Sequence, residues 1–234
     1  MITLTNIHKS FGGTPVLRGV TLTLPKGKST VVIGTSGSGK SVLMKSILGL
    51  VTPDSGTIMQ DSRPLDRAAF LNDFGMLFQG AALFDSLPIW QNVAFRLLRQ
   101  MPKSQARTIA LEKLARVGLE ADVADRLPAM LSGGMQKRAG LARAIATDPK
   151  ILFFDEPTTG LDPIMARAIN DLIRDLVAET GATTLTITHD MTTLHTIADH
   201  IALLDAGTLR WQGTPADLPG SNDTKLNAFL FSGS

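Results

Sequence analysis

The chain has 234 residues, of which 44% are hydrophobic and 19% charged, a composition that indicates a globular protein and excludes a disordered one. It contains no cysteine, so disulfides, cysteine-zinc sites and thiol catalysis are excluded. The 23 basic and 21 acidic residues leave a net charge of +2, which is too small to indicate nucleic-acid binding. We expect neither a signal peptide nor a membrane span, because no apolar run is long enough.

The first quarter of the chain alternates apolar and polar residues with the period of β-strands. The predicted elements are strands over 2–7, 20–24, 30–33 and 57–59, a helix over 40–50, and turns at 11–13, 25–27 and 53–56. The β-branched run over 30–33 is typical of a strand buried on both faces.

The middle of the chain has helical spacing, and the last third alternates strands with helices. The predicted elements are helices over 88–99, 104–117 and 132–146, then strand 151–154, helix 163–180, strand 183–188, helix 191–200 and strand 201–204. Strands that alternate with helices predict an α/β fold with a parallel sheet.

Residues 34–41 match the phosphate-binding loop pattern G-x-x-x-x-G-K-[ST]. The match follows a predicted strand and opens a predicted helix, so an ordinary glycine-serine turn explains it poorly. Glycines let the backbone wrap closely around phosphates, while the N–H groups and the helix N-terminus face their negative charge. We expect Lys40 to reach the β- and γ-phosphates and Ser41 to place its hydroxyl on Mg²⁺.

Asp155 and Glu156 follow the apolar strand predicted over 151–154. Consecutive strand residues point to opposite faces, so both acids can serve one site only where the strand ends. We expect Asp155 to bind Mg²⁺ and Glu156 to polarise the attacking water. The carboxyl end of a strand is where open α/β sheets bind ligands, although an isolated Asp-Glu pair is commonly a solvated strand end.

Residues 131–136 read Leu-Ser-Gly-Gly-Met-Gln and lie between these two motifs. Ser132 is a candidate helix N-cap, and the helix start offers a second phosphate-binding surface. Alone, this stretch is more typical of an ordinary N-cap turn. In this order and position it resembles the signature motif of the ATP-binding-cassette ATPases. The resemblance covers residues 1 to about 215 and implies an α/β fold with a RecA-like P-loop core, an antiparallel β subdomain and an inserted helical subdomain.

The resemblance also implies roles for single residues. Gln79 looks like the glutamine that senses Mg²⁺ and contacts the permease, and His189 like the switch histidine that contacts the γ-phosphate. The implied catalytic residues are Glu156, His189 and Gln79, and the implied Mg²⁺ ligands are Ser41, Gln79 and Asp155. The implied ATP contacts are Phe11, Val16, Gly34, Thr35, Ser36, Gly37, Ser38, Gly39, Lys40, Ser41, Val42, Ser132, Gly133, Gly134 and Asp162, the last in a stretch that resembles the D-loop.

Two positions depart from the family pattern. The chain has no Tyr, and Phe11 stands where family members commonly stack adenine on an aromatic ring. A Phe ring can stack too, so we expect binding to survive with looser base selectivity. Met135 replaces the usual Gln of the signature, which we expect to be tolerated.

The resemblance implies that two copies of the chain face each other head to tail. Each ATP then lies between the 34–41 loop of one copy and the 131–135 signature of the other. On this interpretation ATP closes the pair, and hydrolysis with phosphate release reopens it.

Half of the 12 aromatic residues fall between Phe70 and Phe95, which favours a surface that receives another protein, although packing within a helical subdomain explains them too. The sequence of residues 80–95, together with 131–135, resembles the ATPase subunit of Mla-type phospholipid transporters. The implied partners are an integral membrane permease, an MCE-domain lipid-binding protein and a small STAS-domain subunit, with no nucleic acid. The implied location is the cytoplasmic face of the inner membrane.

Other functions stay open. Amino-acid importers and lipoprotein-release systems use closely similar ATPases, and a non-transport cassette ATPase is a further alternative. A module without turnover is disfavoured, because Gln79, Glu156 and His189 are all present.

We expect one ABC ATPase domain over residues 1–234. Its predicted parts are a β subdomain with the core over 1–85 and 150–215, a helical subdomain over 86–149, and a tail over 216–234. Leu226, Phe229 and Leu230 in the tail have helical spacing, so the tail packs either on its own domain or against a partner.

Overall fold

The computed structural model describes residues 1–231, and its contacts divide the chain into two units. The first unit joins Met1–Leu71 to the chain from Gly181 onward, and the second is Asn72–Thr180. The boundaries of these two units differ from the subdomain boundaries expected from the sequence. The expected subdomains are defined by function and not by contacts, so they stay a prediction. No helix among the described residues is long and apolar enough to cross a membrane.

An antiparallel sheet in the first unit has the strand order β2-β1-β4-β5. Its strands are β1 (Ile2–Phe11), β2 (Thr14–Leu24), β4 (Ser55–Gln60) and β5 (Arg63–Pro64). Ile2 pairs with Leu24, and both are buried. The first two strands run longer than predicted and meet at Gly12 and Gly13, whose positive φ values favour glycine.

A second group of strands in the first unit has the order β10-β9-β3-β8. Its members are β3 (Ser29–Ile33), β8 (Thr183–Ile187), β9 (His200–Asp205) and β10 (Thr208–Gly213). β3 runs parallel to both β8 and β9, and every residue of β3 and β8 is buried. The expectation of a strand covered on both faces at 30–33 is therefore confirmed.

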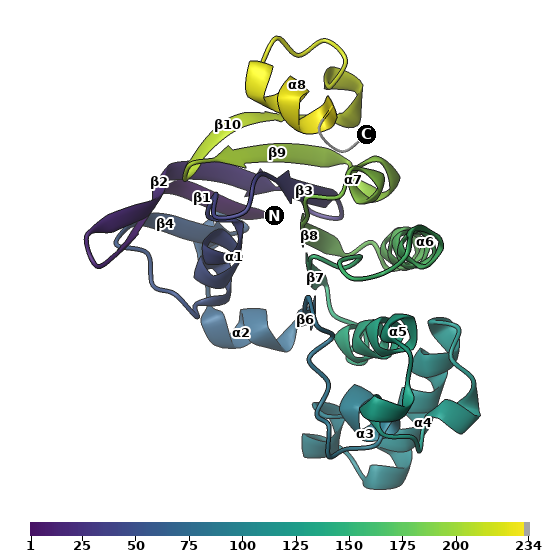
Figure 1. Ribbon diagram of the computed structural model, residues 1–234. Coiled ribbons are helices and arrows are strands. Elements are labelled where there is room, and N and C mark those ends of the chain that lie inside the picture. Colours follow the sequence, from purple (N-terminus) through teal and green to yellow (C-terminus); the bar gives the residue numbers. More distant parts are fainter. Residues whose placement is uncertain (232–234) are drawn as a thin grey trace. The chain divides into compact units, whose positions relative to one another are not determined.

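Short helices accompany these strands (Figure 1). They are α1 (Lys40–Leu48), α2 (Arg67–Asn72), α7 (Met191–Ile197), η4 (Pro215–Asp217) and α8 (Thr224–Phe231). Gly49 ends α1 two residues earlier than predicted, in a left-handed conformation that only glycine adopts readily. Leu226 of α8 is fully buried and Asp223 pairs with Arg210 of β10, so the described part of the tail, 216–231, packs on its own unit, while the predicted tail residues 232–234 lie outside the described residues.

The second unit holds two parallel strands and a group of helices (Figure 1). The strands are β6 (Phe74–Leu77) and β7 (Ile151–Asp155). The helices are α3 (Ile89–Val93), η1 (Leu97–Arg99), α4 (Lys103–Arg116), η2 (Ala121–Val123), η3 (Pro128–Met130), α5 (Gly133–Ala144) and α6 (Pro163–Thr180). Helices α3, α4 and α5 pack against one another.

One predicted helix is wrong. The stretch 88–99 forms two short helices, α3 and η1, instead of one. Asn92 is fully buried, and its side-chain amide donates to the carbonyl oxygens of Phe84 and Leu87 and accepts from the Phe84 N–H. These bonds anchor the helix to the preceding loop, a tertiary constraint that helical spacing does not reveal. The sequence also missed α2, β5, β6 and β10, and it extended α7 three residues too far.

Candidate functional site

The glycine loop (residues 34–39) leaves the carboxyl end of β3 and leads directly into α1. Gly34, Gly37 and Gly39 have φ values of +153°, +78° and +107°, in the region that side chains disfavour. A Cβ on Gly34 would lie 2.2 Å from the carbonyl oxygen of Leu204, so this position has no room for a side chain. The loop can therefore curl tightly in front of the first-turn N–H groups of α1.

Lys40 folds back over this loop. Its Nζ donates to the carbonyl oxygens of Gly34 at 2.6 Å and Thr35 at 3.0 Å, and the residue is 8% exposed. Ser38 Oγ is buried without a hydrogen-bond partner among the described residues, which costs free energy unless a ligand supplies one. A phosphate oxygen would accept from that hydroxyl, so the loop fits a nucleotide. Ser41 is exposed in the first turn of α1.

The remaining predicted loop contacts lie around it. Thr35 and Ser36 are exposed, and Val42 is half-buried in α1. The carbonyl oxygen of Val16 would lie 3.1 Å from a Cβ on Gly39, so β2 passes directly beside the loop. Phe11 ends β1 with 48% of its surface exposed, and its ring is 5.3 Å from the Lys9 ammonium.

His189 is exposed in the turn between β8 and α7. Val32 of β3 pairs in parallel with Ile187 of β8, so the glycine loop and His189 leave their strands at the same edge. The next residue, Asp190, caps α7 by accepting from the Thr192 N–H at 2.8 Å. Within the first unit, the structure therefore brings His189 to the edge that carries the loop.

In the second unit, too, two parallel strands end at the same edge. Leu77 of β6 pairs in parallel with Phe154 of β7, so Gln79 and the two acids emerge at the same edge. β7 ends at Asp155, and Glu156 has a left-handed backbone with φ +48°. The strand thus ends between the two acids, one residue later than the predicted end at 154. Thr159 Oγ1 lies 3.2 Å from Glu156 Oε2 and donates to it.

The signature stretch forms the start of α5. Ser132 is the N-cap, and its Oγ accepts from the Met135 N–H at 3.3 Å, as predicted. Gly133 faces open space, whereas a Cβ on Gly134 would lie 2.4 Å from Met165 Cε. The Asp162 Oδ1 accepts from the N–H groups of Ile164 and Met165, in the manner of a helix N-cap for α6.

Lys137 of α5 is a site residue that the sequence did not reveal. It is 5% exposed, and its Nζ donates to the carbonyl oxygens of Gln79 and Glu156. Burial lowers the pKa of its ammonium, while the nearby charges of Asp155 and Glu156 act to raise it. The sequence signal that could have indicated its burial is its helical spacing with Gly140 and Ala144, which places Lys137 on the inward-packing face of α5.

The side chains expected to bind Mg²⁺ are Ser41, Gln79 and Asp155. No group of three or more His, Asp or Glu residues within the described part of the chain could hold a metal ion by itself. The expected donors are instead one hydroxyl, one amide and one carboxylate, and Mg²⁺ commonly completes its shell with waters and substrate phosphates. Each of these donors is of a kind that Mg²⁺ accepts when it is bound together with a nucleotide.

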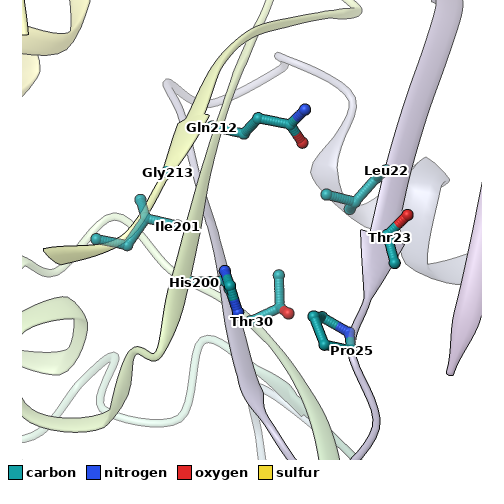
Figure 2. Close-up of a pocket in the computed structure, with 8 residues that line it drawn as sticks. All are labelled: Leu22, Thr23, Pro25, Thr30, His200, Ile201, Gln212 and Gly213. Carbon is teal, nitrogen blue, oxygen red and sulfur yellow. The ribbon is translucent and has the colours of Figure 1, made fainter. Parts of the chain in front are cut away.

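A pocket of about 230 Å³ lies elsewhere in the first unit (Figure 2). Its lining residues are Leu22, Thr23, Pro25, Thr30, His200, Ile201, Gln212 and Gly213. None of the predicted site residues is among them, so we assign this pocket no part in nucleotide binding or hydrolysis.

Residues 17–159 match the family model described as ABC transporter. The probable ribonucleotide transport ATP-binding protein Mkl of Mycobacterium tuberculosis is 39% identical over 237 residues, which cover 98% of this chain and 66% of that protein. The chloroplastic protein trigalactosyldiacylglycerol 3 of Arabidopsis thaliana is 37% identical over 254 residues, covering 98% of this chain and 73% of that protein. Other relatives of similar identity are named for import of methionine or of sulfate and thiosulfate.

Among solved structures, the dimeric post-hydrolysis state of the ATP-binding cassette MJ0796 bound to ADP and Pi is similar, with a TM-score of 0.82. It is 30% identical, and the match covers 92% of this chain and 98% of that one. The expected fold class, a RecA-like P-loop core with an antiparallel β subdomain and an inserted helical subdomain, is confirmed by this likeness.

Proposed function

This chain belongs to the ABC transporter family as one of its ATPase domains, and we propose that it drives the transport of phospholipid, or a related hydrophobic cargo, between bacterial membranes. The observation that carries the cargo is the sequence of residues 80–95 with the Leu-Ser-Gly-Gly-Met signature at 131–135, which resembles the Mla-type ATPases. A relative named for trigalactosyldiacylglycerol, a lipid, supports it. Other relatives are named for ribonucleotide transport or methionine import, and these cargoes are the alternatives that the test must distinguish.

In this proposal the first unit binds the phosphates. The N–H groups of the glycine loop and of α1 surround them, and the Lys40 ammonium exchanges its carbonyl partners for phosphate oxygens. Phe11 stacks on the base beside Val16, and His189 contacts the γ-phosphate. Ser41, Gln79 and Asp155 hold Mg²⁺, which supplies positive charge to the phosphate oxygens.

Glu156 acts on the attacking water in this proposal. Its carboxylate orients the water and accepts its proton as the water oxygen bonds to the γ-phosphorus and the bond to the β–γ bridging oxygen breaks, which releases ADP and phosphate. Thr159 donates to Oε2 of this carboxylate and so restrains it.

The proposed partner at the nucleotide is a second copy of the chain. The start of α5, with Ser132, Gly133 and Gly134, offers N–H groups and a positive helix end that suit the phosphates of an ATP held by the other copy, and Asp162 lies nearby in this pairing. The dimeric state of the MJ0796 cassette supports this arrangement. A membrane permease, an MCE-domain protein and a STAS-domain subunit complete the proposed complex on the cytoplasmic face of the inner membrane.

Hydrolysis is tested by Glu156→Gln, which keeps the size of the side chain but removes its basicity. We expect the rate of ATP hydrolysis to fall by about 10²- to 10⁴-fold, the typical contribution of a general base. Glu120→Gln is the matched control, because Glu120 is an exposed glutamate of the same unit. Normal hydrolysis by Glu156→Gln would remove Glu156 from the role of general base.

The cargo is tested by recovering tagged Glu156→Gln protein from detergent-solubilised membranes and identifying its partners by mass spectrometry. The variant is expected to hold ATP and its permease. A permease recovered with an MCE-domain protein supports lipid transport. A permease recovered with a periplasmic amino-acid-binding protein refutes the lipid cargo and leaves the ATPase chemistry intact.

A further inference from the structure

Helix α5 lies unusually close to the strand and loop that carry Gln79. A Cβ on Gly140 would lie 2.9 Å from Leu77 Cδ1 and 3.2 Å from Ala81 Cβ. On the β6 side, a Cβ on Gly75 would lie 2.0 Å from the carbonyl oxygen of Ala144. Glycine at both places lets the two backbones approach, so short contacts join α5 to the segment 75–82.

Lys137 stands one helical turn before Gly140 on this face. Its ammonium donates to the Glu156 carbonyl oxygen at 3.2 Å and to the Gln79 carbonyl oxygen. The acceptors lie in two different segments, after β6 and after β7, 58 and 19 residues away along the chain. A single buried cation therefore links the backbones of both segments to α5.

The backbone at these acceptors needs support. Glu156 has a φ of +48°, and Ala81 and Ala82, just after Gln79, have φ values of +60° and +49°. Such conformations are unfavourable in non-glycine residues and persist where the surroundings hold them. Arg143, another cation of α5, donates to the carbonyl oxygens of Ala81 and Ala82, each at 2.6 Å.

We propose that Lys137 is a positioning residue for hydrolysis. Lys137 binds the carbonyl groups of both Gln79 and Glu156, and so fixes the backbone positions from which the two side chains extend. It also couples these two residues to α5, the helix that starts with the signature. A displacement of α5 then moves Gln79 and Glu156 with it, and the geometry for water attack is lost or restored as one event. The inference rests on the proposed roles of Gln79 and Glu156.

Lys137→Met tests this, because it keeps the length of the chain and removes every donor. It is measured on the full chain in its membrane complex, as kcat and KM for ATP and as equilibrium ATP affinity. We expect kcat to fall about 10- to 100-fold with KM and affinity within about twofold, the pattern of an interaction that matters in the transition state. Lys137→Arg, whose guanidinium can reach both carbonyl groups, is expected to recover most of the rate.

Lys113→Met is the matched control. Lys113 is also buried in the second unit, at 4% exposure, but it pairs with Asp148 at 2.7 Å and touches neither Gln79 nor Glu156. We expect it to lower the melting temperature without changing kcat. If Lys137→Met does not fold, Lys137→Gln, which can still donate to one carbonyl, takes its place.

Two results would overturn the inference: a kcat for the Lys137 variant within twofold of the Lys113 control, or a parallel loss of ATP affinity and kcat. Glu156→Gln separates this failure from that of the proposed function. If Glu156→Gln is inactive while Lys137→Met is normal, only the positioning role falls. If Glu156→Gln hydrolyses ATP normally, the roles on which the inference rests fall first.

Discussion

At the scale of single residues, Phe11 is the clearest departure from the family pattern. It ends β1 with nearly half of its surface exposed, beside the Lys9 ammonium, so its ring has a free face. A Phe ring stacks on any base but has no hydrogen-bonding group to read one. We therefore expect a nucleotide site whose affinity depends on stacking and little on the identity of the base.

Phe11→Ala is predicted to weaken ATP and GTP binding alike, by about tenfold, because one base–aromatic stack contributes about 1–3 kcal/mol. Isothermal titration or a fluorescent nucleotide measures both dissociation constants. Phe84→Ala, which removes a similarly exposed ring from the second unit, serves as the control and should leave both unchanged. Unaltered affinities in Phe11→Ala would rule out stacking on this ring.

At the scale of elements, the second unit depends on a close approach between β6 and α5. Gly75 makes that approach possible, because a side chain there would collide with the backbone of Ala144. Gly80, a few residues later, faces open space. The two glycines therefore differ in what they contribute, although both belong to the same stretch of sequence.

Gly75→Ala is predicted to lower the free energy of unfolding by about 1–3 kcal/mol, the usual cost of overpacking. Gly80→Ala should change it by less than about 0.5 kcal/mol, as surface substitutions do. Chemical denaturation followed by circular dichroism measures both values. Equal stabilities of the two variants would mean that β6 and α5 do not approach this closely.

At the scale of the whole molecule, each unit carries only part of the proposed site. The glycine loop and His189 belong to the first unit, whereas Gln79, both acids and the signature belong to the second. The helix start at Ser132 is exposed and serves no nucleotide of its own chain in the proposed dimer. Assembly of two copies is then a condition for turnover.

Glu156→Gln protein is predicted to run as a monomer without nucleotide and as a dimer with ATP and Mg²⁺, in size-exclusion chromatography with light scattering. Adding Ser132→Arg should abolish the dimer, because a long cation would occupy the phosphate-facing helix start, while the 34–41 loop still binds ATP. Ser104→Arg, at an exposed serine of α4, is the control and should leave the dimer intact. A dimer that persists with Ser132→Arg would contradict the head-to-tail pairing.

The sequence by itself determined the motifs and most of the elements. The loop at 34–41, the acids at 155 and 156, and the N-cap at Ser132 each depend on residues a few positions apart, whose geometry follows from the chain itself. The α/β class followed from periodicity in the same way. Helix α6 was predicted to the residue because its 18 residues keep one apolar face.

Only the tertiary structure decided the remaining features. The anchoring of α3 to the loop before it depends on Asn92, and the burial of Lys137 depends on carbonyl groups 19 and 58 residues away. The same lysine on a solvated helix would be an ordinary surface charge. Burial and hydrogen-bond partners come from segments that meet only on folding, so spacing along the chain carries little trace of them.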